Sequence, residues 1–341
     1  MIAVVTGSSG FIGSHLTDAL IAAGSEVRVL LRPETPVAPR AGAIAFEADV
    51  LDRGSLERSG IWDGCTHVFH LGGRTRGSRL EDFRSGNTRP TENILAALHA
   101  RALSPRFVLM SSQAAAGPAV SLEEPTTELD PCRPVEVYGQ SKLEAELAVA
   151  HYLPNIPATI LRPSAVYGPR DRDFLRIFRE ASRRYGFYPT PGTQLFSIVH
   201  VADVVEAVLD VVRVECTIGQ TYFVANREHT SWERIYEAIG SLAVRKGTYF
   251  HAPAMAMRAA GLIGDLYARL RADSRPLVTS AKVKLALQEY WLCDSARLTA
   301  ATGWIPRLTL QQGLRDTYLA YARAHALRPH PTGGAAENPE E

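Results

Sequence analysis

Short apolar segments alternate with longer amphipathic segments through the first half of the chain. The short segments are rich in β-branched residues, whereas the longer ones repeat apolar residues at helical spacing. This alternation is typical of parallel strands joined by helices that cover both faces of a sheet. We predict strands over residues 2–6, 26–31, 43–47, 67–71, 106–111 and 158–162. We predict helices over residues 11–23, 91–101 and 137–153. The fold class is therefore α/β, with a Rossmann-type doubly wound parallel sheet.

The pattern becomes less regular after about residue 168. Residues 174–185 are amphipathic, and residues 201–214 read as a strongly apolar helix. Capping-box sequences that begin helices start at Thr230 and at Thr309, each followed three residues later by Glu or Gln.

These changes indicate two domains and a tail. We predict a Rossmann domain over residues 1–165, to which residues 195–215 return. Residues 166–325 are predicted to form mainly a smaller, mixed α/β substrate-binding domain. Residues 326–341 are rich in Pro, Gly, Ala and Glu and are predicted to be a disordered tail.

Composition and charge limit the kinds of binding partner that we expect. Hydrophobic residues make up 46% of the chain and charged residues 21%, and the formal net charge is +1. A balanced charge gives no electrostatic reason to expect nucleic acid, so we expect a small-molecule substrate. The four cysteines are far apart and form no CxxC pair. We therefore expect neither a disulfide framework nor a metal site. The same pattern indicates a protein of a reducing compartment.

The sequence gives no sign of export or of a membrane span. The chain begins with a strand-like segment and a glycine turn, without the basic start and cleavage site of a signal peptide. No apolar run reaches the length that a transmembrane helix needs, and residues 253–270 are interrupted by charges. We expect a cytoplasmic protein without a transmembrane segment.

Three glycines lie between the first predicted strand and the first predicted helix. Gly7 permits a tight turn, Gly10 lets the backbone approach a pyrophosphate, and Gly13 allows close packing of helix on strand. The helix start then offers free N–H groups and a positive dipole end to phosphates. The alternative is a tight loop without a ligand. We expect a dinucleotide to contact Gly7, Ser9, Gly10, Phe11, Ile12 and Gly13.

The end of the second strand indicates which dinucleotide is preferred. An acidic residue there binds the adenosine ribose hydroxyls, whereas an arginine favours a 2′-phosphate. Leu31 occupies the expected acidic position, and Arg32 follows it. This favours NADP(H), with NAD(H) as the alternative if Arg32 is only a loop residue and Glu34 holds the ribose.

Tyr138 and Lys142 are one helical turn apart and share a face. A tyrosine with an ordinary pKa near ~10 is a poor acid or base at neutral pH. A lysine ammonium nearby stabilises the phenolate and lowers that pKa. We therefore predict Tyr138 as general acid/base, with Lys142 tuning it and holding the nicotinamide ribose. The alternative for this spacing is an ordinary exposed helix.

A serine pair ends the fifth predicted strand, at the sheet edge where ligands bind. A serine hydroxyl there can donate to a substrate carbonyl or alkoxide. We predict that Ser112 does so, with Ser111 in that role as the alternative. Asn87 is a candidate for a proton relay or for positioning the helix, and His70 and His200 are interpreted as structural.

These motifs, in this order, resemble the extended short-chain dehydrogenase/reductase (NAD-dependent epimerase/dehydratase) family. The resemblance covers nearly the whole chain, because further segments match as well. The matching segments are residues 6–13, 49–50, 70–73, 87–93, 111–112, 138–142, 161–169, 196–203, 303–306 and 308–314.

The resemblance implies several further contacts with the cofactor. Asp49 and Val50 would lie against the adenine, Leu71, Gly72 and Gly73 would run beneath the cofactor, and residues from Pro163 to Val166 would approach the nicotinamide. It also implies a homodimer that pairs through the helices near residues 91–101 and 138–153.

Two departures from the family pattern stand out. Gly72 and Gly73 replace two alanines, which is expected to loosen the loop that leads to Arg79. Pro90 is expected to shorten the N-terminal end of the helix that follows Asn87.

Two kinds of reaction compete within this family. Ser164 stands where nucleotide-sugar epimerases commonly have asparagine, and Gln113 with three alanines follows Ser112, where dehydratases have acids. Arg28, Arg32 and residues 167–173 and 196–200 are more similar to the dihydroflavonol reductase and 3β-hydroxysteroid dehydrogenase branch. We therefore predict reversible hydride transfer between NADP(H) and a secondary alcohol or ketone. An epimerase or dehydratase with tightly bound NAD is the first alternative, and a non-catalytic dinucleotide sensor the second.

The segment of residues 251–270 leaves its role open. It is apolar and contains two methionines, so it can line the pocket of a hydrophobic substrate. It can equally be a core or dimer helix, and a membrane-surface helix is a third interpretation.

Overall fold

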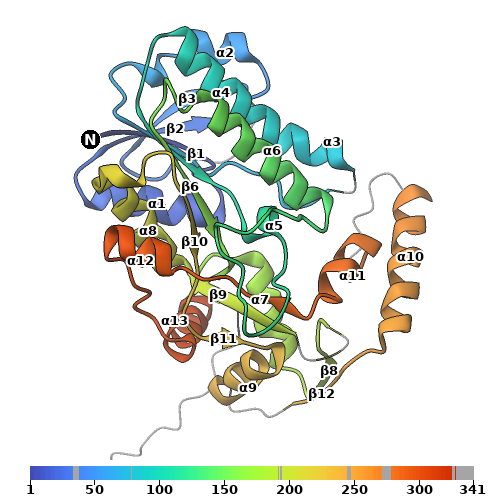
Figure 1. Ribbon diagram of the computed structural model, residues 1–341. Coiled ribbons are helices and arrows are strands. Elements are labelled where there is room, and N and C mark those ends of the chain that lie inside the picture. Colours follow the sequence, from blue (N-terminus) through green and yellow to red (C-terminus); the bar gives the residue numbers. More distant parts are fainter. Residues whose placement is uncertain are drawn as a thin grey trace, which may run out of the picture.

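Seven parallel strands form the main sheet, in the order β10-β6-β5-β4-β1-β2-β3 (Figure 1). The computed structural model describes residues 1–33, 38–77, 79–190, 192, 194–243, 247–270, 278–324 and 327. The strands are β1 Ile2–Thr6, β2 Glu26–Leu31, β3 Ala43–Glu47, β4 His67–His70, β5 Arg106–Met110, β6 Ala158–Pro163 and β10 Thr221–Val224. The predicted Rossmann-type α/β fold is confirmed, because the first six of these agree with the predicted strands to within one residue at either end.

Strand β10 was not predicted from the sequence. It has only four residues, and it pairs with β6 at the edge of the sheet. So short a segment has no periodicity of its own, and pairing with a formed neighbour is what makes it a strand.

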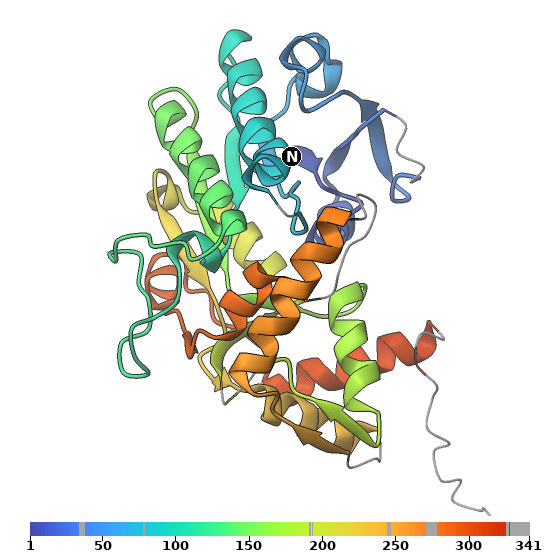
Figure 2. The same ribbon diagram turned by 90° about the vertical axis from the view of Figure 1, so that its right-hand side faces the viewer.

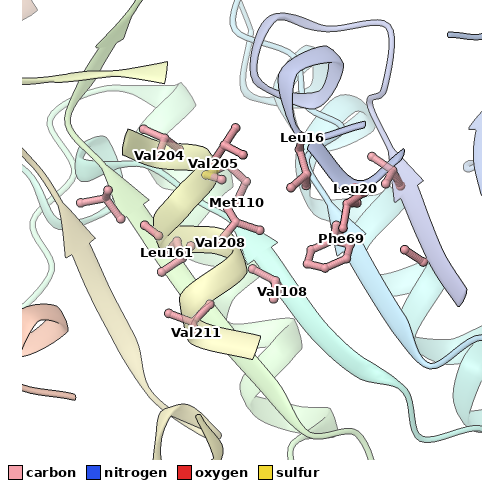
Figure 3. Packing of buried hydrophobic residues seen from close by; sticks show 14 of the residues in the cluster. Leu16, Leu20, Phe69, Val108, Met110, Leu161, Val204, Val205, Val208 and Val211 are labelled. Atoms are coloured by element: carbon pink, nitrogen blue, oxygen red, sulfur yellow. The ribbon is translucent and has the colours of Figure 1, made fainter. Parts of the chain in front are cut away.

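Helices cover both faces of this sheet. On one face, α1 (Phe11–Ala22) and α8 (Val201–Arg213) pack Leu16, Leu20 and Val208 against buried side chains of the strands (Figure 3). The other face is covered by α2 (Arg53–Arg58), α4 (Arg89–Ala100) and α6 (Val137–Tyr152). Burial on both faces explains why the strands are continuous apolar runs in the sequence.

A second core lies below the carboxyl ends of the main strands (Figure 1). Its sheet has the order β11-β9-β13, and β7 also pairs with β9. The strands are β7 Ala165–Tyr167, β9 Leu195–His200, β11 His229–Thr230 and β13 Tyr290–Trp291, and a separate pair is formed by β8 Tyr185–Phe187 and β12 Thr248–Phe250. The helices are α7 Arg172–Ala181, α9 Trp232–Leu242, α10 Ala254–Leu270, α11 Ser280–Ala286, α12 Ala296–Thr302 and α13 Leu310–Arg323.

The two predicted capping boxes have different outcomes. Thr309 caps α13 as predicted, and Gln312 completes the reciprocal bond. Thr230 lies in β11 instead, and Ser231 caps α9 by accepting a hydrogen bond from the Arg234 N–H. The prediction at Thr230 was therefore wrong by one residue, because pairing with β9 keeps Thr230 extended. Likewise, the amphipathic helix predicted over 174–185 ends at Ala181, since Tyr185 begins β8.

A π-helical turn, Arg84–Thr88, leads directly into α4. Pro90 lies in the first turn of α4, where its missing N–H costs nothing. The shortening expected from Pro90 therefore affects only the α-helix, because the helical backbone begins earlier in the chain, as the wider π turn. Such turns are frequent at functional sites, and this one contains the buried Asn87.

Within the described ranges, no helix has both the length and the apolar character needed to cross a bilayer. The predicted disordered tail, residues 326–341, lies outside the described residues except for Leu327.

Candidate active site

The glycine turn joins β1 to α1 at the carboxyl edge of the main sheet. Gly7 has φ +74°, and a Cβ there would lie 2.6 Å from the Gly72 nitrogen. At Gly13 a Cβ would lie 2.1 Å from the Gly7 carbonyl oxygen. Both positions therefore need glycine for steric reasons, as the sequence predicted.

The start of α1 presents unoccupied backbone donors. Gly10 occupies the N-cap, and among the described residues no side chain hydrogen-bonds to this cap. The first N–H groups of the helix, at Phe11 and Ile12, have no partner within the helix itself. The turn is thus shaped and polarised to hold a pyrophosphate.

A chain of hydrogen bonds fixes the loop after β4. The Gly72 N–H donates to Thr6 Oγ1 at 3.3 Å, and Thr6 Oγ1 lies 2.6 Å from His70 Nδ1. On the other side of the ring, His70 Nε2 lies 3.0 Å from Thr91 Oγ1, which donates to the Asn87 carbonyl oxygen. This chain ties Gly72 to β1 and α4, and the looser loop expected between Gly73 and Arg79 stays a prediction.

His70 itself is a structural histidine. Burial lowers its pKa to about 3, and the positive charge of Lys142 lowers it further. Both ring nitrogens are occupied by threonine hydroxyls. A neutral ring with both nitrogens hydrogen-bonded is suited to positioning the loop.

Tyr138 lies in the first turn of α6. The carboxylate of Glu136 caps this helix by accepting from the N–H groups of Tyr138 and Gly139, both at 2.7 Å. The Tyr138 ring packs edge-on against Phe83, with 5.9 Å between the ring centroids. Its hydroxyl is close enough to Ser112, two residues after the end of β5, for that hydroxyl to act on its pKa.

The surroundings of Tyr138 favour the protonated hydroxyl. Burial raises the pKa of the Tyr138 hydroxyl to about 12, although the hydrogen bond to Ser112 acts to lower it. The sequence analysis expected Lys142 to lower this pKa. In the protein alone that effect is not seen, because desolvation dominates and the ammonium is directed to another partner. A phenol that keeps its proton at neutral pH is ready to act as an acid.

Lys142 lies on the same face of α6, one turn after Tyr138, as predicted. Its Nζ donates to the carbonyl oxygen of Met110, the last residue of β5, at 2.8 Å. Burial lowers the pKa of the Lys142 ammonium, and the carboxylate of Glu146 partly opposes this effect. The resulting pKa is about 8. A Cβ on Gly73 would lie 3.2 Å from Nζ, so the glycine gives the ammonium room beside the loop.

Ser111 points away from this cluster. Its hydroxyl donates to Glu146, which also forms a buried ion pair with Arg162 at 2.6 Å. The Arg162 guanidinium further contacts the sulfur of Cys132 at 3.0 Å and lies over the Phe223 ring. Because its hydroxyl is engaged below the site, Ser111 fits a structural role better than the alternative role of active hydroxyl.

Sequence reasoning missed the pair formed by Glu146 and Arg162. Glu146 lies one further turn along α6, so Tyr138, Lys142 and Glu146 repeat at intervals of four on one helix face. That spacing was the available signal. A carboxylate on the buried face of a helix needs a partner, and Arg162 on β6 was the candidate.

Asn87 uses its whole side chain to hold neighbouring segments. Its Oδ1 accepts from the Arg74 N–H at 2.7 Å, and its Nδ2 donates to the Arg74 carbonyl oxygen and to Ser141 Oγ at 2.8 Å. Of the two roles considered for Asn87, these contacts favour positioning α6 and the loop after Gly73.

The residues considered for the adenosine end lie after β2 and β3. Asp49 forms a turn in which its carboxylate accepts from the Leu51 N–H at 2.9 Å, and the Val50 carbonyl accepts from Asn93. Arg32 is exposed directly after β2, and no described residue forms an ion pair with it. Arg28, by contrast, is held by Glu26 and by backbone carbonyls, so it has a structural role. Glu34 lies outside the described residues.

Pro163 ends β6, and Val166 lies in β7, where it pairs with Val199 of β9. Between them, Ser164 has a buried hydroxyl without a hydrogen-bond partner among the described residues. Gln113 Nε2, just after Ser112, is equally unsatisfied. Buried polar atoms of this kind normally have partners, so these two fit a site that binds a polar ligand.

His200 is interpreted as structural, like His70. Its Nδ1 caps α8 by accepting from the Ala202 N–H at 3.2 Å, and burial lowers its pKa to about 4. The ring lies edge-on to Tyr167, away from the tyrosine–lysine face of α6.

Parallel strands explain why residues far apart in sequence meet at one edge. The ends of β1, β4 and β5 carry the glycine turn, the loop of Leu71–Gly73 and Ser112, and the order β5-β4-β1-β2 reverses direction between β4 and β1. Dinucleotides bind at such a reversal. The glycine cradle and the unsatisfied polar atoms fit a nicotinamide dinucleotide. Fold and site thus define a Rossmann-type enzyme that uses this kind of cofactor.

Comparison with known proteins identifies the family. Residues 3–225 match the model of the NAD dependent epimerase/dehydratase family, and the chain belongs to that family. The predicted resemblance is therefore confirmed.

The similar proteins include both reductases and epimerases. The 4-hydroxy-2-methyl-3-oxo-4-farnesyl-3,4-dihydroquinoline-1-oxide ketoreductase of Stigmatella aurantiaca is 28% identical, over 96% of this chain and 98% of that protein. Ceramide reductase of Caulobacter vibrioides is 28% identical, over 95% of each chain. The structure of Thermus thermophilus UDP-glucose 4-epimerase in complex with NAD superposes with a TM-score of 0.75 and 26% identity, over 95% of this chain and all of that one.

Proposed function

We propose that this enzyme transfers a hydride between NADP(H) and a secondary alcohol or ketone of a fairly apolar substrate. One observation carries the proposal. The Ser112 hydroxyl acts on the hydroxyl of Tyr138 at the carboxyl edge of the sheet, and Lys142 lies one turn further along α6.

The reaction needs one hydride and one proton. The bound nicotinamide supplies or accepts the hydride. In the direction of reduction, the Ser112 hydroxyl donates a hydrogen bond to the carbonyl oxygen and orients it. The Tyr138 hydroxyl gives its proton to that oxygen as negative charge develops, and the Lys142 ammonium stabilises the phenolate that remains. Ketone, hydride and proton together give the alcohol.

Two observations support a reductase rather than an epimerase or a dehydratase. Among the relatives similar over nearly their whole length, a ketoreductase for a farnesylated compound and a ceramide reductase are 28% identical, whereas a UDP-glucose 4-epimerase is 24% identical. The names of the two reductases describe apolar substrates. In addition, α5 (Gln113–Ala116), which directly follows Ser112, contains no acidic residue to protonate a leaving hydroxyl.

A substrate screen with NADPH and NADH tests the proposal. We expect apolar ketones to be reduced with one cofactor oxidised for each alcohol formed. Conversion of UDP-glucose to UDP-galactose without net consumption of cofactor would establish the epimerase alternative. Cofactor binding without turnover of any substrate would establish the sensor.

The cofactor preference is tested at Arg32. A charge-assisted hydrogen bond to a 2′-phosphate contributes about 1.5–3 kcal/mol, so Arg32→Glu is expected to lower kcat/KM for NADPH by about tenfold to a hundredfold. The value for NADH should change little. Arg213→Glu, on the distant α8, is the matched control and should leave both values unchanged. Equal losses for both cofactors in Arg32→Glu would contradict the proposed phosphate contact.

Lys142 predicts a pH dependence. Its pKa is lowered to about 8, so the ammonium loses its proton as the pH rises through that value. Because the charge is required, kcat/KM for NADPH is expected to be constant below about pH 7 and to fall about tenfold per pH unit above about pH 9.

The variant Lys142→Arg separates this ionisation from others. A guanidinium stays protonated above about pH 12, so the fall at high pH should vanish in the variant even if its rate is lower overall. An unchanged pH profile in Lys142→Arg would assign the fall to another group.

A further inference from the structure

Helix α10 (Ala254–Leu270) buries small residues and exposes large apolar ones, the reverse of an ordinary surface helix. Among its described side chains, the buried residues are Gly261 and Gly264, whereas the large apolar side chains face outward. Leu262 is 66% exposed and Ile263 67%. The exposed apolar face of α10 consists of Met255, Leu262, Ile263, Leu266, Tyr267 and Leu270. Surface helices normally bury this stripe, so the orientation calls for a partner.

The glycines explain the orientation. A Cβ at Gly261 would lie 3.1 Å from Ser280 and from Val283, so the backbone of α10 packs closely on α11 (Ser280–Ala286). The carboxylate of Asp265, the only acidic residue of α10, accepts from the Ser280 N–H at 3.3 Å. The core interpretation of this segment is therefore wrong. Both views show α10 as the outermost element on its side of the molecule (Figures 1 and 2).

The apolar surface continues beyond the helix. Strand β12 ends at Phe250, four residues before the first residue of α10, and pairs with β8. Phe250 and Phe187 are 54% and 65% exposed, with 6.4 Å between their ring centroids. Exposed aromatic rings beside an apolar helix are typical of an interface between water and lipid.

Positive charge gathers at α11, the helix on which α10 packs. Lys282, on α11, is close enough to Arg76 and Arg176 that their charges lower its pKa further, beyond the effect of burial. The charge of Asp173 acts on Lys282 in the opposite sense, and Asp173 is paired with Arg76. The three cations of this group, Arg76, Arg176 and Lys282, complement an anionic surface.

The same pair of helices flanks the candidate active site. The charge of Lys284, on α11, acts on the carboxylate of Glu136, which caps α6 beside Tyr138. Helix α11 thus connects α10 with the segment that positions Tyr138.

From these observations we infer that the exposed apolar face of α10, together with Arg76, Arg176 and Lys282, docks on an anionic lipid bilayer. The helix lies in the plane of the interface, with its leucines among the acyl chains and the cations at the head groups. This docking does not depend on which substrate the enzyme reduces, so it can fail or succeed separately from the proposed function.

Co-sedimentation of the full chain with vesicles tests the apolar contribution. We expect binding to vesicles of phosphatidylglycerol mixed with phosphatidylcholine. The double variant Leu262→Gln, Leu266→Gln should bind at least about tenfold more weakly, because each leucine buried in lipid contributes about one to two powers of ten. Val120→Gln with Leu129→Gln is the matched control, since those side chains are 81% and 88% exposed elsewhere. The control should bind like the wild type.

The charge contribution is tested separately. Arg176→Gln with Lys282→Gln should weaken binding to these vesicles by about fivefold per charge, and raised salt should do the same. Arg315→Gln with Arg323→Gln, both exposed on α13, is the control. Binding to pure phosphatidylcholine should be weaker than to the anionic vesicles.

Three results would overturn the inference. The first is unchanged vesicle binding by the leucine variant, and the second is equal binding to neutral and anionic vesicles. The third is a dimer, seen by size-exclusion chromatography, that dissociates in the leucine variant, because the face would then belong to a second copy of the chain. All variants should keep the wild-type melting temperature to within about 2 °C, since exposed positions contribute little to stability.

Discussion

Tyr138→Phe is expected to lower kcat about a thousandfold, the usual range for loss of a general acid. The variant removes one oxygen atom and keeps the ring that packs on Phe83. Binding of NADPH should stay within about threefold of the wild type, because the glycine turn and Arg32 are untouched. Steady-state kinetics with the substrate found in the screen, together with a fluorescence titration of the cofactor, would measure both effects.

A matched tyrosine on the same helix serves as control. Tyr152 ends α6, and its ring packs edge-on against His99 and His151, remote from Ser112. Tyr152→Phe should therefore keep full turnover and normal cofactor binding. Full turnover by Tyr138→Phe would instead show that the proton comes from another group, and the mechanism proposed here would have to be abandoned.

Arg162→Met is expected to destabilise the protein by about 3–5 kcal/mol, because it leaves the Glu146 carboxylate buried without its cation. Both side chains are almost fully buried, at 6% and 5% exposure. The Ser111 hydroxyl alone cannot replace a guanidinium that forms two hydrogen bonds to the carboxylate. Urea denaturation, followed by circular dichroism, would measure the change in the free energy of unfolding.

Two further variants separate burial of a lone charge from loss of packing. Adding Glu146→Leu to Arg162→Met should recover most of the stability, since the apolar pair leaves no unpaired charge. Arg84→Met breaks the more exposed ion pair between Arg84 and Glu144, a residue that lies on α6 like Glu146. This variant should lower the free energy of unfolding by less than about 1 kcal/mol. Similar losses in Arg84→Met and Arg162→Met would refute the argument from burial.

Much of the fold could be predicted because its strands are buried on both faces. Continuous apolar runs mark β1 at the residues where the structure has it, and β5 and β6 to within one residue. The edge strands β10 and β11, of four and two residues, escaped prediction, since pairing with a formed neighbour decides them. Thr230 shows the same effect, because β pairing moves the helix cap to Ser231.

The candidate site likewise has features that can be predicted from the sequence and features that cannot. Glycine positions are imposed by local backbone geometry, and Tyr138 and Lys142 by the period of one helix, so both can be read from the chain. The partner of Lys142 cannot be read in this way. Its hydrogen bond to Met110 and the raised pKa of Tyr138 depend on what surrounds α6 after folding.

The sequence by itself determined the order of strands and helices, the phosphate-binding turn and the family, because these follow from short-range periodicity and backbone sterics. Only the tertiary structure decided that Ser112 rather than Ser111 meets Tyr138, that Glu146 pairs with Arg162, and that α10 turns its leucines outward. The physical reason is burial. Whether a side chain meets water, a charge or another segment depends on residues that are distant in sequence, and pKa values, ion pairs and exposed faces follow from that surrounding.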